Sequence, residues 1–224
     1  MRFKLIILFA GFILNFSGCL NLEVETFIGA DGSGSAIVHY WTEYEVLFND
    51  TSSSNQFSFK ENLIRNNFSD ENIEIKSIKV WQKKEDSTYH AEIKIVFDDI
   101  NKLSNCTFFK SYGISFVDGA QGQKIFQQKL TNPNFTSDAS NKYKIKFTYH
   151  FPGPIITDNA TERRNNSLVW SFTLDQLKND KTLTATVKVP TNASLEYVIT
   201  LSVLVLIALW IILIVRKRKK RTEE

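Results

Sequence analysis

Apolar and polar residues alternate along several stretches of this chain, and the alternation predicts β-strands. A period of two places one face of a strand in the core and the other in solvent. Half-buried strands of this kind favour an antiparallel sheet. The stretches with this pattern are residues 89–97, 143–151, 168–174 and 183–189.

Glycine-rich turns separate two further pairs of apolar runs. Residues 22–28 and 35–41 flank the sequence Gly-Ala-Asp-Gly-Ser-Gly at 29–34. Asp118-Gly119, followed by Gly122, separates the runs near Ile114 and Ile125. Glycine readily adopts the positive backbone dihedral angles of a tight hairpin. Both segments therefore predict β-hairpins.

Helical patterning is sparse between these strands. Residues 57–68 place apolar side chains, including Leu63 and Ile64, on one side of an amphipathic helix. Residues 98–104 predict a second, shorter helix with Ile100 and Leu103 turned inward. We therefore expect an α+β fold: a mainly antiparallel β-sheet with one or two covering helices, plus a C-terminal transmembrane helix.

Two apolar segments bracket this domain and predict its layout. Arg2 and Lys4 precede an apolar stretch at 5–14 that is too short to span a bilayer, as in a signal peptide. Residues 197–215 carry no charge and are long enough to cross about 30 Å of hydrocarbon. Basic residues follow at 216–221 and indicate a cytoplasmic C-terminus. The expected layout is a signal peptide at 1–18, an extracytoplasmic domain at 19–194, a transmembrane helix at 195–215 and a basic tail at 216–224.

Cys19 stands at the end of the signal-peptide segment. The sequence Phe16-Ser17-Gly18-Cys19 resembles a bacterial lipobox, although Leu is usual where Phe16 stands. The resemblance implies that Cys19 becomes the first mature residue and carries diacylglycerol and fatty acyl groups such as palmitate. The alternative is that Cys19 lies near an ordinary cleavage site. Cys106 is the remaining cysteine, so an acylated Cys19 leaves no disulfide within the chain.

The charge balance bears on the class of partner. The formal net charge is +3, but six of the basic residues belong to the tail, and the domain itself is near neutral. Nucleic-acid binding needs a concentrated basic face, so we expect no nucleic-acid partner. The tail is expected to contact anionic lipid head groups. The segment between the two apolar runs is long enough for one domain.

Several short motifs together resemble the LppM-type bacterial lipoprotein domain family. These are the lipobox-like Cys19, the turn at 30–34, the segments 151–155 and 159–160, and Ser-Leu-Val-Trp at 167–170. The resemblance implies an envelope lipoprotein with a mixed sheet-and-helix domain and no established catalytic site. The expected transmembrane helix and basic tail predict location at the cytoplasmic membrane, with the main domain outside.

Familiar catalytic and metal-binding motifs are missing from the sequence. It contains no GxSxG, HExxH or P-loop motif. His39, His90 and His150 lie on the polar phases of three different predicted strands, without a second metal ligand at a suitable spacing. Phe108 and Phe109 follow Cys106 closely and suggest that it is buried. We therefore expect that the protein is not an enzyme and binds no metal or cofactor. Residues distant in the sequence can still form an active site when the chain folds.

Phenylalanine is abundant, with 18 residues. Most of them fall on inward phases and are expected to pack the core. A more specific hypothesis is that Phe108, Phe109, Phe116 and Phe126 line an apolar groove for a lipid or glycolipid acyl chain from the adjacent bilayer. The expected partners are thus membrane lipid and a lipid or envelope-protein ligand.

A eukaryotic type I surface glycoprotein is the alternative class. Between the two apolar runs, seven asparagines begin Asn-x-Ser/Thr sequons: Asn49, Asn67, Asn105, Asn134, Asn159, Asn165 and Asn192. The shortage of cysteines fits poorly with a secreted eukaryotic domain. The interpretation we favour is a membrane-anchored bacterial envelope lipoprotein that acts as a non-catalytic binding or structural module.

Overall fold

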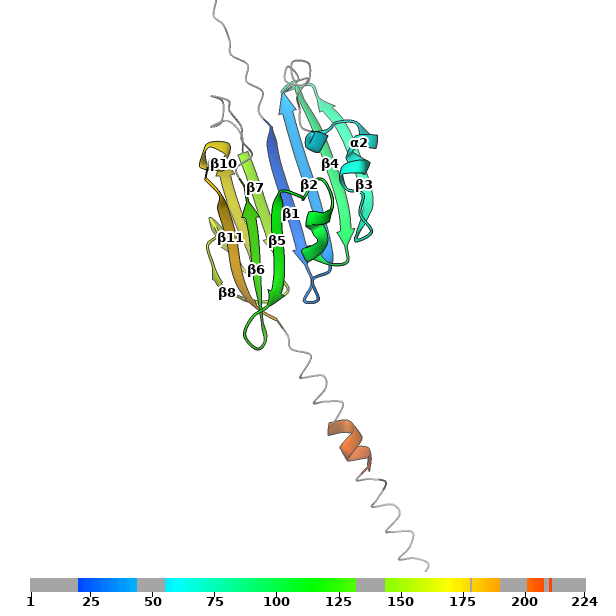
Figure 1. Cartoon of the computed structure of the whole chain (residues 1–224), viewed down its shortest axis with the longest axis vertical. Helices are drawn as coiled ribbons and strands as arrows, with labels where there is room; N and C mark the ends of the chain where they lie inside the picture. The colour runs from blue at the N-terminus through cyan, green and yellow to red at the C-terminus, as the bar shows by residue number, and fades with distance from the viewer. Residues whose placement is uncertain are drawn as a thin grey trace, which may run out of the picture.

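The computed structural model of this protein describes residues 20–43, 55–131, 144–177, 179–189, 201–207 and 210. Two β-sheets form the body of the molecule (Figure 1). The lipidation candidate Cys19, the expected signal peptide at 1–18 and the basic tail at 216–224 lie outside the described residues, as does most of the segment 195–215.

The described strands follow one another along the chain with three short 3-10 helices and one α-helix between them. The strands are β1 (Asn21–Ile28), β2 (Gly34–Glu43), β3 (Ile73–Lys83), β4 (Thr88–Phe97), β5 (Tyr112–Asp118), β6 (Gln123–Leu130), β7 (Lys144–His150), β8 (Ile155–Asp158), β9 (Glu162–Arg164), β10 (Ser167–Thr173) and β11 (Lys181–Lys188). The helical elements are η1 (Asn55–Phe57), α2 (Glu61–Asn67), η2 (Ile100–Asn105) and η3 (Leu174–Leu177).

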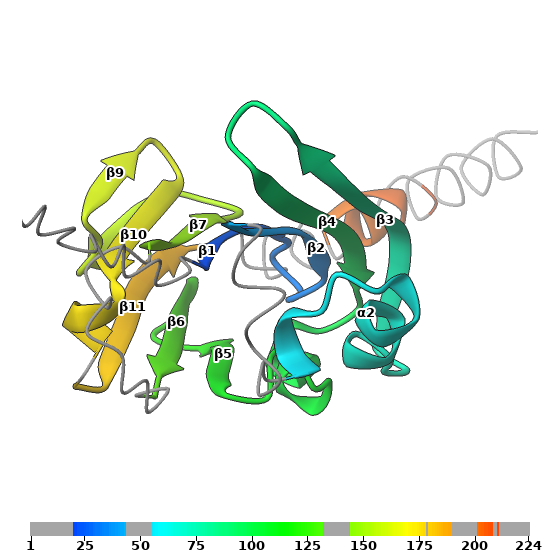
Figure 2. The same ribbon diagram turned by 90° about the horizontal axis from the view of Figure 1, so that it is seen from above.

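The strands divide into a seven-stranded and a four-stranded sheet. The larger has the order β3-β4-β2-β1-β7-β10-β9, and the smaller has the order β5-β6-β11-β8. Figure 2 shows β5, β6 and β11 in a layer beneath β1, β7 and β10, while α2 lies beneath the end of the larger sheet that contains β3 and β4. One face of the larger sheet is therefore covered. Its other face, called the outer face below, carries the polar phase of each strand.

Both predicted hairpins are confirmed. β1 pairs with β2, and β5 pairs with β6, each in antiparallel register. The turns contain Gly32 with φ of 91° and Gly122 with φ of 73°, a left-handed conformation that glycine adopts without steric cost. The four alternating stretches are also strands, namely β4, β7, β10 and β11.

One pairing departs from the expected antiparallel pattern. β1 and β7 are parallel neighbours, with Val24 opposite Phe147. Local alternation reports which face of a strand is buried and says nothing about the direction of its neighbour, so the sequence pattern did not reveal this crossover.

The core lies between the covered face of the larger sheet and the layer beneath it. It is rich in aromatic side chains. Phe126 from β6 meets Tyr149 from β7 at a ring-centroid distance of 4.4 Å, and Trp170 from β10 lies 6.1 Å from Phe126. Phe68 and Phe108 fill the layer beneath β2 and β4, at a centroid distance of 4.6 Å. The abundance of phenylalanine thus largely reflects the packing between layers.

The α+β fold class is wrong, because the described domain is mostly β-sheet. The predicted helix at 57–68 shrinks to the seven residues of α2, and Lys60 at its N-cap makes no side-chain capping hydrogen bond. The predicted helix at 98–104 is the 3-10 helix η2. Asp99 is its N-cap residue, and the Asp99 side chain accepts a hydrogen bond from Asn101 N–H. Short apolar periodicity did not distinguish these turns from full α-helices.

The C-terminal transmembrane helix of the expected fold is not found among the described residues, and most of its segment, 195–215, lies outside them. Residues 201–207 are helical with exposed side chains. Within the described part of the chain, no helix has the length and apolar character needed to cross a membrane.

Candidate functional site

Two histidines and two tryptophans gather on the outer face of the larger sheet. His39 and Trp41 lie two residues apart on β2, and strand pairing places Trp41 and Trp81 on opposite sides of His90. Directly paired residues of antiparallel strands point to the same face, so three neighbouring strands contribute to one group. We call these four residues the histidine–tryptophan cluster.

The four rings are nearly parallel, with the two imidazoles between the two indoles. Trp81 lies 4.9 Å from His90 between ring centroids, at an interplanar angle of 9°. His39 lies 4.8 Å from Trp41 at 28°. Such ring pairs contribute about 0.5–1.5 kcal/mol each beyond the area that they bury. Trp81 keeps 38% of its surface exposed, so one side of the cluster remains open to a ligand.

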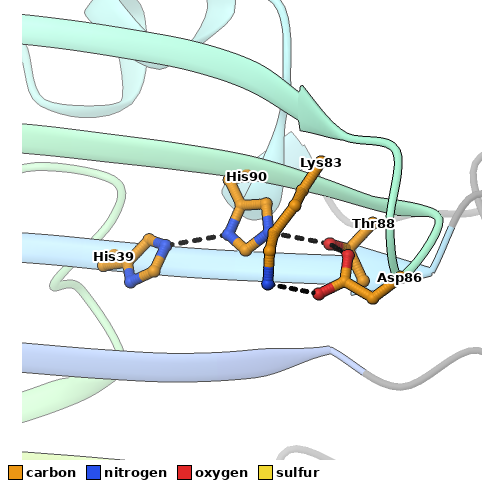
Figure 3. Close-up of polar contacts among 5 residues, drawn as sticks. All are labelled: His39, Lys83, Asp86, Thr88 and His90. Atoms are coloured by element: carbon orange, nitrogen blue, oxygen red, sulfur yellow. Dashed lines mark hydrogen bonds and ion pairs between the residues drawn. The ribbon is translucent and has the colours of Figure 1, made fainter.

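A chain of polar contacts runs from the cluster to the β3–β4 turn (Figure 3). His39 Nε2 lies 3.1 Å from His90 Nδ1, and His90 Nε2 lies 2.7 Å from Thr88 Oγ1. The Thr88 hydroxyl donates to Asp86, whose other carboxylate oxygen lies 2.8 Å from Lys83 Nζ. Hydrogen bonds from Lys83 and Thr88 lower the pKa of Asp86, which keeps it a carboxylate.

The direction of each hydrogen bond follows from that carboxylate. Because Asp86 only accepts, Thr88 gives it the hydroxyl hydrogen and accepts from His90 Nε2–H. The neutral His90 then has its lone pair on Nδ1, where it accepts from His39 Nε2–H. The lone pair of His39 is left on Nδ1. The network therefore determines the tautomer of both rings.

Burial keeps both rings neutral. Desolvation lowers the pKa of His39, although Glu23 and Glu92 oppose it, and desolvation together with His39 lowers the pKa of His90. A neutral imidazole pair beside indoles presents flat apolar faces together with hydrogen-bonding edges. Such a surface suits a ligand with a weakly polar face and hydroxyl groups.

A cavity lies between the β1–β2 and β5–β6 turns. Its volume is about 740 Å³, and Asp31, Asp118 and Lys124 contribute to its lining. Lys124 Nζ is 3.0 Å from Asp118 Oδ1 and lies over the Phe116 ring, 5.7 Å from the centroid. Lys124 and Asp118 thus pair with each other, while Asp31 accepts hydrogen bonds from Ser33.

The structure places the four phenylalanines proposed for the lipid groove in the core. Phe108, Phe109, Phe116 and Phe126 are at most 2% exposed. None of them lines the cavity between the turns or a second cavity that is bordered by Phe27, His150 and Phe151. A lipid at these positions would require the two layers to separate, and the groove stays a prediction.

Cys106 is the cysteine that the structure describes. Cys106 is buried, and desolvation raises the pKa of its thiol, as its apolar neighbours suggested. Among the described residues, no group of three or more His, Cys, Asp or Glu side chains is arranged to hold a metal ion.

Two sequon asparagines among the described residues are engaged in the fold, and one of them, the buried Asn67, donates from Nδ2 to Gln56 O at 3.2 Å. Asn159 Nδ2, the atom that a glycan would modify, donates to Thr182 O at 2.7 Å. Its Oδ1 accepts from Trp170 Nε1–H and from Thr184 N–H, each at 2.9 Å. Asn159 therefore connects the two sheets.

Sequence reasoning located the histidines on outward phases but missed their association. His39 and His90 are 51 residues apart, and β3, which carries Trp81, was not predicted. The available signal was the pair of aromatic residues on the polar phase of β2, His39 and Trp41, where charged or small polar side chains are usual. His150 also lies on this outer face, on β7.

Comparison with known proteins bears on the fold. A scan against protein-family models finds no match, and a search of curated proteins finds none either. Among solved structures, the chain is similar to the NMR structure of the folded domain of LppM from Mycobacterium tuberculosis, with a TM-score of 0.50 and 12% sequence identity. The match covers 80% of this chain and 95% of that chain. The resemblance to LppM-type domains is confirmed at the level of a distant fold likeness.

Proposed function

We propose that this chain is a bacterial envelope lipoprotein, anchored through acyl groups on Cys19, whose folded domain binds a lipid or glycolipid of the membrane that carries it. The fold likeness to a lipoprotein domain over 95% of that domain supports this class of protein. The lipobox-like sequence before Cys19 supports the anchor.

The position of the histidine–tryptophan cluster supports a ligand in the membrane surface. One residue, Leu20, separates Cys19 from β1, so the first residue of β1 lies within about 10 Å of an acylated cysteine. That residue, Asn21, is paired with Trp41, and Trp41 is paired with His90, which is paired with Trp81. The cluster is therefore level with the start of β1. Neighbouring strands are about 4.8 Å apart, which places β3 about 14 Å from β1 along this row.

This single observation, the row from Asn21 to Trp81, carries the assignment of the ligand surface. Tryptophan is favoured at membrane interfaces because one side of its ring system is apolar and its N–H is polar. Figure 1 shows that β1 begins at the end of the molecule opposite to the end where β11 finishes. An anchor at Cys19 thus brings the cluster, rather than the cavity between the turns, to the head groups.

Native mass spectrometry of the full-length protein in detergent micelles tests this ligand class. With glucosyl diacylglycerol as the probe, Trp81→Ala should bind about tenfold less than the wild type, because truncating a central interface tryptophan commonly costs more than about 1.4 kcal/mol. Val80 is the matched control, because it is equally exposed on the same strand but faces the opposite way. Equal binding by the wild type and Trp81→Ala would remove the ligand surface from the proposal.

A further inference from the structure

Three side chains from three strands form a second hydrogen-bond chain on the outer face. Ser167 Oγ on β10 lies 2.7 Å from His150 Nδ1 on β7. His150 Nε2 lies 2.7 Å from Glu25 Oε1 on β1. Because these residues are far apart in the sequence, they form no sequence motif. Folding places a hydroxyl, an imidazole and a carboxylate in one line.

The hydrogen-bond directions give the serine a base. The Glu25 carboxylate accepts only, so His150 Nε2 carries the hydrogen. The lone pair of the neutral ring is then on Nδ1, where it accepts from the Ser167 hydroxyl. This is the arrangement of nucleophile, base and positioning carboxylate found in serine hydrolases, with the two ring nitrogens exchanged. Each nitrogen of imidazole can serve in either role.

The His150 ring is held in place and borders a cavity. It stacks on Phe27 at a centroid distance of 4.1 Å and an interplanar angle of 3°. A cavity of about 380 Å³ is lined by His150 together with Phe27, Ile28, Ser35 and Phe151. Its mixture of apolar rings and hydroxyl groups suits a small acyl group next to the base.

A cation stands on the other side of the serine. Ser167 is paired with His150 across β7 and with Arg164 across β9. Directly paired residues share a face, with Cβ atoms about 5 Å apart. The Arg164 side chain thus begins beside Ser167, and its guanidinium bonds Glu162 at 2.7 Å.

We propose that Ser167 is a nucleophile toward carboxylic esters of short acyl chains, with His150 as general base and Glu25 as a positioning residue. Oγ bonds to the ester carbonyl carbon while its proton moves to His150 Nδ1 and the carbonyl electron pair moves to oxygen. The tetrahedral species then collapses, the bond to the alcohol oxygen breaks, and His150 returns the proton to that oxygen. A water activated by His150 hydrolyses the acyl-serine and releases the carboxylic acid.

Fluorophosphonate labelling of the full-length protein in detergent tests this inference. The serine oxygen displaces fluoride from phosphorus, and peptide mass spectrometry locates the adduct. We expect labelling at Ser167 and none in Ser167→Ala. Ser171 is the matched control, since it lies on the same strand and face but pairs with Lys146. Labelling of Ser171 to the same extent, or no labelling of Ser167, would overturn the proposal.

The roles of His150 and Glu25 are tested by separate measurements. His150→Gln should slow labelling about 100-fold, as loss of a general base does. Glu25→Gln should lower kcat for p-nitrophenyl acetate hydrolysis with little change in KM, because the imidazolium formed when His150 takes the serine proton loses its neighbouring negative charge. A merely structural carboxylate would leave kcat unchanged. Should His150→Gln fail to fold, the site of labelling in the wild type still decides the matter.

Discussion

Replacing Phe126 by alanine distinguishes a core residue from a lipid-lining one. The Phe126 side chain is fully buried and packs against Tyr149, Phe151 and Trp170, at centroid distances of 4.4, 5.4 and 6.1 Å. Truncating a phenylalanine in such a site costs about 3–5 kcal/mol, from lost burial and the cavity that remains. We therefore expect Phe126→Ala to lower the free energy of unfolding by about that amount.

Urea unfolding of the full-length protein in mild detergent, followed by circular dichroism, measures the loss. With a slope of about 2 kcal/mol per M, the midpoint should fall by about 2 M. Ile125 is the control, because it is the preceding residue on β6 and is 42% exposed. Ile125→Ala should change stability by less than about 0.5 kcal/mol. An unchanged midpoint in Phe126→Ala, with less co-purified lipid, would refute the core packing and favour the groove.

Two further predictions concern polar groups. The folded state lowers the pKa of His39 and His90 below 6.5, so the unfolded chain takes up protons first on acidification. The free energy of unfolding should be level above neutral pH and fall as the pH drops through about 6.5; a stability that rises on acidification, or a slope that persists when both are glutamine, would contradict this. Asn159→Ala should cost about 1–3 kcal/mol in a urea titration, because it leaves the buried Trp170 N–H without an acceptor. Asn159→Asp keeps that acceptor and should lose less, and equal losses would count against the reasoning.

The positions of strands and hairpins were predictable from the sequence where apolar and polar residues alternate without interruption. The hairpins around Gly32 and Gly122 follow from local backbone preference. β3 was missed because its apolar positions change phase: Ile73 and Ile75 are followed by Ile78, and the register shifts at a bulge between Ile75 and Ser77. The short helices were overestimated, because packing beneath the sheet rather than helix propensity determines them.

The candidate sites required the three-dimensional structure. His39 and His90 meet only when β2 and β4 pair. Glu25, His150 and Ser167 meet only because β7 lies parallel to β1, a pairing that alternation does not reveal. Sequence predicts which side of a strand a residue occupies, whereas strand order decides which residues share that side. Chemistry spread over several strands is therefore invisible until that order is known.

The intact mass of the detergent-extracted protein, expressed in a bacterium, tests the lipoprotein assignment most directly. The account predicts a mature chain that begins at Cys19 and carries the additional mass of diacylglycerol, and predicts that Cys19→Ser lacks this mass. A wild-type protein with an unmodified Cys19, or one cleaved at another position, would contradict the anchor and with it the placement of the histidine–tryptophan cluster at the membrane surface.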